Sequence, residues 1–146
     1  ESALNHKRLN PSLSKDEEMQ KLFNFSAIEK EVDRRKGIYT FNDSDSNDKQ
    51  IIKVNGTFYL TSNFFAFCGK KLYDTSRMEI NRCVYDVMRH DDVISVRIEG
   101  KKGIIFTDLR IERKILELKN SKERDEFYEI VVSKWRSENE ATSKEM

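Results

Sequence analysis

The densest run of apolar positions lies between Val54 and Gly69, in the segment VNGTFYLTSNFFAFCG. Asn55-Gly56 is a typical tight-turn pair, and after it Phe58 and Leu60 alternate with smaller or polar residues, as expected of a strand with one buried face. Ser62-Asn63 then interrupts the apolar positions, and a second, almost wholly apolar run follows. The pattern predicts two short strands that form a central hairpin of a small sheet.

Further strands are predicted on both sides of this hairpin. In residues 25–41 the apolar positions are interrupted by Arg34-Arg35-Lys36-Gly37, which predicts a loop between two short strands or within one. The alternation of Ile94, Val96 and Ile98 with polar residues is the most regular in the chain and predicts that these three side chains share one face. The remaining predicted strands are residues 78–88, 104–106 and 115–118, separated by polar connections and by the basic turn 100–103. In all, about seven strands are predicted.

A helix is predicted at each end of this strand-rich region. Ser14 and Glu17 form a capping-box pattern ahead of apolar residues at helical spacing, which predicts a helix over residues 15–24. Asn120 and Glu123 mark a second helix start. The apolar stripe of that second helix consists of Phe127, Ile130, Val131 and Trp135.

A bent antiparallel sheet with one terminal helix has a simple physical arrangement. The sheet curls into an open barrel or sandwich, and the helix covers the open end. Burial of Phe127 and Trp135 there contributes roughly 2–3 kcal/mol for each side chain. The predicted fold class is mainly β (α+β): a curved antiparallel sandwich or barrel with a C-terminal amphipathic helix and a short N-terminal helix.

Composition limits the functional classes. The chain has 146 residues, 36% of them charged, and a formal net charge of only +1, so it lacks the positive field of a nonspecific nucleic-acid binder. No apolar run approaches the roughly 20 residues of a membrane span. Cys68 and Cys83 lie in apolar contexts and are expected to be buried free thiols in a reducing compartment. The chain begins at Glu1 without a methionine, so we expect it to be part of a larger intracellular protein.

The sequence carries no recognisable catalytic or metal-binding constellation. His6 lies in a polar lead-in, and His90 stands beside Asp91-Asp92 in a predicted turn, so both are expected to be surface residues. Neither cysteine has a nucleophile motif, and no glycine-rich phosphate loop is present. The acidic segment 43–48 lacks the glycine and the glutamate that a calcium loop needs. We therefore expect no enzymatic activity, no cofactor and no metal.

The order of elements and three local patterns resemble the GRAM family of the pleckstrin-homology (PH) superfold. Residues 56–67, GTFYLTSNFFAF, are similar to the family's G-x-L-Y-L-T-x-N-F-x-x-F hairpin. Residues 14–25 look like the acidic helix that leads into its first strand, and residues 123–135 are similar to the R-D-E-A-Y…L-W pattern of its closing helix. The resemblance covers residues 15–136 and implies a PH-like fold, although residues 34–48 and 101–119 are longer than the family pattern.

The resemblance also implies a ligand, either an anionic lipid headgroup or a protein. Phosphates are held by charge-assisted hydrogen bonds, so basic residues in loops are the candidates, and no clear K-x-n-K/R-x-R phosphoinositide signature crosses the first hairpin. Each exposed cation contributes on the order of 1 kcal/mol, so several must converge, and a cluster taken alone is more simply a solvated loop. The candidate headgroup-binding residues are Arg34, Arg35, Lys36, Lys70, Lys71, Lys101 and Lys102.

We therefore expect a non-catalytic targeting or docking module, with a flexible lead-in over residues 1–14, a PH-like domain over 15–136 and a flexible tail over 137–146. The expected ligand is an anionic membrane lipid, a phosphoinositide, which would hold a cytoplasmic protein at the membrane periphery. The alternative is a protein partner bound at a sheet edge or at the exposed face of the C-terminal helix. No nucleic-acid partner is expected.

Overall fold

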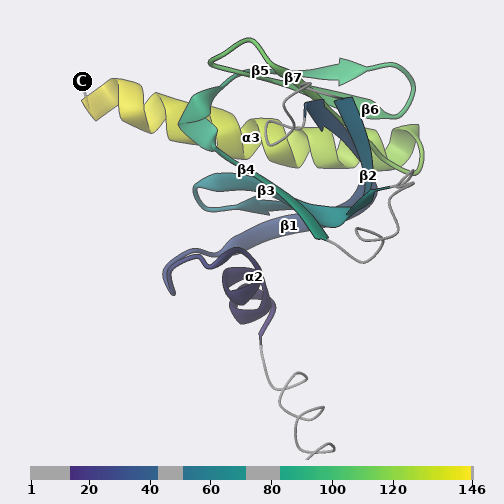
Figure 1. Cartoon of the computed structure of the whole chain (residues 1–146). Helices are drawn as coiled ribbons and strands as arrows, with labels where there is room; N and C mark the ends of the chain where they lie inside the picture. Colours follow the sequence, from purple (N-terminus) through teal and green to yellow (C-terminus); the bar gives the residue numbers. More distant parts are fainter. Residues whose placement is uncertain (1–13, 43–50, 72–82, 146) are drawn as a thin grey trace, which may run out of the picture.

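The computed structural model describes residues 14–42, 51–71 and 83–145, and over these ranges the chain forms a single curved antiparallel sheet with helices packed against it (Figure 1). The strands are hydrogen-bonded in the order β4-β3-β2-β1-β7-β6-β5, and the sheet does not close. This arrangement confirms the predicted fold class. The elements are α2 (Lys15–Phe23), β1 (Glu31–Asn42), β2 (Ile51–Thr61), β3 (Phe64–Lys71), β4 (Cys83–Arg89), the 3-10 turn η2 (His90–Asp92), β5 (Val93–Glu99), β6 (Gly103–Asp108), β7 (Arg113–Glu117) and α3 (Ser121–Glu145).

The inner face of the curved sheet encloses an aromatic core that α3 covers. Phe58 stacks on Phe106 with ring centroids 5.1 Å apart and meets Phe127 of α3 edge-on at 5.8 Å. Phe127 is fully buried, and the indole Nε1 of Trp135 donates a hydrogen bond to the Val93 carbonyl at 3.0 Å. The predicted helix stripe is therefore the covering face. The helix continues to Glu145, through residues that we expected to form a tail.

A second, smaller cluster lies on the outer face of the sheet, beneath α2. Met19 is fully buried there against Tyr59 and Ala66, and Phe23 and Phe25 pack around them. The helix begins as predicted, because the Ser14 side chain accepts a hydrogen bond from the Glu17 amide and the Glu17 carboxylate accepts one from the Ser14 amide, both at 3.2 Å.

The central hairpin is confirmed, but the turn predicted at Asn55-Gly56 is wrong. Strands β2 and β3 pair on either side of Ser62-Asn63, whereas β2 passes through Gly56 without turning. Gly56 pairs with Gly37 on one side and with Gly69 on the other. A side-chain carbon on Gly56 would lie only 2.1 Å from the Cys68 carbonyl oxygen. The glycine therefore marks a close approach of neighbouring strands.

The alternation predicted over residues 93–98 is also wrong in part. A register irregularity between Val93 and Ser95 shifts the pairing of β5 with β6. As a result Val93 and Val96 are buried, while Ile94 is 47% exposed and Ile98 44% exposed. Ile94 and Ile98 therefore do not share the buried face of β5 with Val96.

Candidate anion-binding site

The basic run Arg34-Arg35-Lys36 lies within strand β1, so the prediction that it forms a loop is wrong. Each of the three residues pairs with a residue of β2, and the strand continues to Asn42. Successive side chains of a strand point to opposite faces, so Arg34 and Arg35 face different surroundings. A run of charges in sequence is therefore not a patch on the surface.

Arg34 is held on the outer face of the sheet by a carboxylate and an aromatic ring. Its guanidinium donates three hydrogen bonds to the Glu31 carboxylate, at 2.6, 2.9 and 3.0 Å. It also lies 5.0 Å from the ring centroid of Tyr59. The hydrogen bonds to Glu31 raise the pKa of Arg34 above its ordinary value. Its charge is already compensated, which leaves little for a phosphate.

Arg35 points the other way and connects β1 with α3. Its guanidinium contacts Asp33 at 3.1 Å, Glu123 at 3.7 Å and Glu126 at 3.9 Å. It also lies 5.6 Å from the ring centroid of Phe127. With three carboxylates around it, Arg35 is a structural residue.

The lysines at Lys70-Lys71 were also predicted in a loop and instead end strand β3. Lys70 is exposed and pairs with Cys83 of β4, while the Lys71 side chain lies outside the described residues. Lys36 is exposed on β1, with β2 between it and β3. Strand β3 continues through these two lysines because its hydrogen bonds join backbone N–H and C=O groups, which do not depend on the polarity of the side chains.

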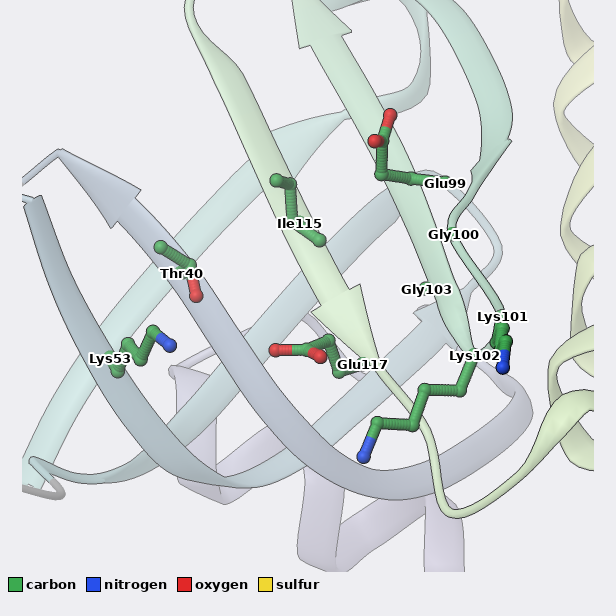
Figure 2. Close-up of a pocket in the computed structure, with 9 residues that line it drawn as sticks. All are labelled: Thr40, Lys53, Glu99, Gly100, Lys101, Lys102, Gly103, Ile115 and Glu117. Carbon is green, nitrogen blue, oxygen red and sulfur yellow. The ribbon is translucent and has the colours of Figure 1, made fainter.

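Lys101 and Lys102 lie in the predicted tight turn between β5 and β6, and they border a cavity of about 400 Å³ (Figure 2). Lys53 of β2, a residue that the sequence analysis missed, lines the same cavity. Ile115 contributes an apolar wall. The other lining residues are Thr40, Glu99, Gly100, Gly103 and Glu117.

The backbone of this turn is fixed by hydrogen bonds from outside it. One guanidinium nitrogen of Arg124, in the first turn of α3, donates to the carbonyls of Gly100 at 2.8 Å and Lys101 at 2.7 Å. The Leu118 amide donates to the Lys102 carbonyl at 2.8 Å. Gly100 has a φ of +65°, which a glycine adopts without strain. The two lysines therefore extend from a preorganised backbone.

The cavity combines cations with hydrogen-bond acceptors. Three lysines against the carboxylates of Glu99 and Glu117 give a local formal charge of +1. Ammonium groups bind phosphate oxygens, and carboxylates accept hydrogen bonds from hydroxyl groups. The arrangement can hold a ligand that carries both phosphate and hydroxyl groups, and Glu99 and Glu117 oppose a ligand that carries phosphate alone.

The described residues show no reaction centre. His90 was expected at the surface, but it is 2% exposed, because its Nε2 lies 3.1 Å from the Phe64 carbonyl and its ring packs 4.6 Å from Phe65. Both cysteines are free thiols as predicted, but the prediction that they are buried is wrong, because Cys83 is exposed and Cys68 only half-buried. Burial, followed by the neighbouring Cys83, raises the pKa of the Cys68 thiol.

Among the described residues no group of three His, Cys, Asp or Glu side chains could hold a metal. His6 and the segment 43–48 lie outside the described residues.

Inside the sheet lies a polar network that the sequence did not reveal. The Tyr39 hydroxyl donates to the Asp86 carboxylate at 2.7 Å, and the Lys114 ammonium lies 3.1 Å and 3.2 Å from its two oxygens. Burial, followed by the charge of Asp86, raises the pKa of Tyr39 well above its ordinary value. These groups satisfy one another, so we assign them a structural role.

Comparison with known proteins identifies the fold. No family model and no curated protein matches the sequence. A solved C-terminal domain of an unknown protein from Leishmania infantum is similar over 80% of this chain and 94% of its own, with a TM-score of 0.53 and 15% identity. The linker-DH/PH domains of p115-RhoGEF are similar over 85% of this chain with a TM-score of 0.53, and the DH/PH domains of PDZ-RhoGEF, solved with GTP-gamma-S activated RhoA, over 88% with a TM-score of 0.52, each at 14% identity. The chain spans about a third of those two RhoGEF chains, 34% and 35%. It has a PH-like fold.

Proposed function

We propose that this chain is a non-catalytic targeting domain of the GRAM type, and that it binds a phosphoinositide headgroup in the cavity beside the β5–β6 turn. The observation that carries the proposal is that Lys53, Lys101 and Lys102 line one cavity, beside a turn fixed by Arg124. A phosphoinositide headgroup offers phosphates to the lysines and ring hydroxyls to Glu99 and Glu117. No helix among the described residues is long and apolar enough to cross a membrane.

The chemistry of the cavity predicts a moderate and salt-dependent affinity. Each lysine near an anionic lipid surface contributes on the order of 1 kcal/mol, and exposed charges are screened by salt. Lys36 and Lys70 are exposed and can add general attraction to an anionic surface from outside the cavity. We leave Arg34 and Arg35 out of the proposed site, because each is already paired with a carboxylate.

Vesicle co-sedimentation tests the proposal. Wild-type protein is compared with Lys101→Glu/Lys102→Glu and with Lys53→Glu on phosphatidylcholine vesicles with and without phosphoinositide. We expect at least about a thirtyfold loss of affinity for the double variant, since the loss of two attractions of about 1 kcal/mol each already gives this factor and each reversal adds a repulsion. A double reversal of two exposed lysines of α2, Lys15→Glu/Lys21→Glu, is the matched control and should change binding less than about twofold. Equal recovery of wild type on both kinds of vesicle contradicts the proposal.

A protein partner is the alternative function, and one observation favours it. Strand β5 ends the sheet beside α3 and carries Ile94 and Ile98, which are 47% and 44% exposed. An outer strand with exposed apolar side chains suits contact with an extended peptide, although α3 already bonds two β5 carbonyls, those of Val93 through Trp135 and of Val96 through Tyr128. Under this alternative Ile98→Asp removes a partner captured by cross-linking and leaves vesicle binding unchanged.

A further inference from the structure

The turn between β6 and β7, residues 109–112, exposes two aliphatic side chains at its tip. Leu109 is 61% exposed and Ile111 is 64% exposed, with Arg110 between them. Both values are high for large apolar residues, and both occur within three consecutive positions. Neither side chain belongs to the hydrophobic clusters of the described residues.

A buried carboxylate holds this turn in shape. One oxygen of Asp108, which is 6% exposed, accepts hydrogen bonds from the amides of Arg110 at 2.9 Å and Glu112 at 3.0 Å. The backbone of Asp108 adds bonds to Glu112 and Ile111, and the Leu109 amide donates to the Asp92 carbonyl at 2.9 Å. The aliphatic tip is therefore rigid and cannot easily fold back to bury its side chains.

Ile111 also has a backbone conformation that isoleucine seldom adopts. Its φ is +63°, in the left-handed region, where β-branched residues are genuine outliers. Asparagine or glycine would occupy this position with less strain. A residue that is both strained and exposed gives the isolated fold no advantage, which is a reason to look for a role of Ile111 outside the fold.

We propose that this turn inserts Leu109 and Ile111 into the interfacial region of a membrane, as a second contact of the domain. The charges support an anionic lipid surface as the partner: Arg110 and Arg113 are exposed beside the aliphatic tip, whereas Glu112 is only partly exposed and the Asp108 carboxylate accepts hydrogen bonds from the turn's own amides. Cations at headgroup level with aliphatic side chains below them suit an anionic interface.

This inference rests on the proposed membrane function and adds an orientation to it. The cavity turn and the aliphatic turn lie at the two ends of β6, which spans residues 103–108. Simultaneous contact at both turns lays β6 along the membrane surface. Neither contact alone is strong, so together they raise the affinity by acting from one rigid body.

Substitution of Ile111 by asparagine separates a functional role from a structural one. Because asparagine tolerates the left-handed conformation, Ile111→Asn should raise the midpoint of urea unfolding and lower vesicle affinity about fivefold to tenfold. The matched control is Ile28→Asn, since Ile28 is 80% exposed in the α2–β1 connection. The control should leave vesicle affinity unchanged. A fall in both stability and affinity for Ile111→Asn assigns the residue to the fold and overturns the proposal.

A fluorescent reporter tests insertion directly. Leu109→Trp should be quenched by brominated acyl chains, beyond the wild-type signal of Trp135, whereas Ile28→Trp should not. If Leu109→Trp is not quenched while Lys101→Glu/Lys102→Glu still loses binding, the cavity proposal stands and insertion is wrong. If wild-type protein binds no vesicle at all, both are wrong. If Ile111→Asn binds vesicles normally and loses a protein captured by wild type, the tip fits a protein pocket and the proposal is overturned.

Discussion

Arg35 ties the first strand of the sheet to the last helix of the chain. Its guanidinium reaches carboxylates from both elements, Asp33 in β1 and Glu123 and Glu126 in α3, and lies over the Phe127 ring. The side chain is 20% exposed, so these contacts are less screened than those of a fully solvated ion pair. The sequence suggested a ligand site at Arg35 because it does not show which carboxylates lie beside this residue in the fold.

Charge reversal at this position should therefore weaken the fold. We expect Arg35→Glu to lower the free energy of unfolding by about 2 kcal/mol, because it places a fourth carboxylate among three and removes the cation over Phe127. Urea unfolding followed by circular dichroism measures the change. The adjacent exposed residue gives the control: Lys36→Glu should stay within about 0.5 kcal/mol of wild type. Equal effects of the two substitutions contradict the structural role of Arg35.

The ion pair of Lys114 and Asp86 is more deeply placed, with side chains 8% and 15% exposed. Lys114→Met should lower the free energy of unfolding by about 3–4 kcal/mol, since it leaves the buried Asp86 carboxylate with the Tyr39 hydroxyl as its one side-chain hydrogen-bond donor among the described residues. The double variant Asp86→Leu/Lys114→Met removes both charges and should be clearly more stable than the single one. A double variant that is as unstable as the sum of both single variants shows that packing, and not charge, dominates there.

At the scale of elements, local sequence signals predicted where most strands and both helices lie, and failed where a neighbouring strand decides the conformation. The capping box at Ser14 and the break at Ser62-Asn63 depend on residues a few positions apart, so they can be recognised in the sequence. Asn55-Gly56 carries the same kind of signal as a hairpin turn, but its glycine faces Gly37 and Gly69 across two strand pairs. Only the register of β1, β2 and β3 shows that this glycine lies inside a strand and not in a hairpin turn.

The two uses of glycine lead to different mutational effects. Gly56→Ala should cost more than about 4 kcal/mol or prevent folding, because its new carbon would meet the Cys68 carbonyl at 2.1 Å. Gly100→Ala meets no atom within 4 Å and should cost only about 1 kcal/mol, from the positive φ alone. Expression yield and urea unfolding of the two variants measure the contrast. Similar costs for both contradict the close strand approach.

The candidate site is a property of the whole molecule more than of any segment. Lys101 and Lys102 were predicted because a short basic turn between two glycines is visible in the sequence. Lys53 was not predicted, because its place at the cavity depends on contacts between strands. It pairs with Thr40 of β1, and Thr40 in turn pairs with Ile115 of β7, which also lines the cavity. The same argument explains Glu117, which pairs with Ile38 and Gly103 and so reaches the same opening from a third strand.

The two hydrophobic clusters lie on opposite faces of the sheet and differ in size. The inner one joins all seven strands to α3 through Phe127 and Val131, whereas the outer one joins α2 to part of the sheet through Met19. Loss of the outer cluster leaves the inner one intact, because the hydrophobic core that α3 covers has no contribution from α2. The molecule should therefore open in two steps of unequal free energy.

Native-state hydrogen exchange makes this division measurable. Amides of α2 should exchange through a local opening at least about 2 kcal/mol below the global free energy of unfolding, and those of β2 and the first turns of α3 only through global unfolding. Met19→Ala should lower protection in α2 while β2 keeps its protection, because the cavity it creates lies in the outer cluster. Phe127→Ala should lower protection throughout, by about 3–5 kcal/mol, since its ring fills the core that all strands share. Equal loss of protection in β2 for the two variants would show that α2 unfolds together with the sheet, as one cooperative unit.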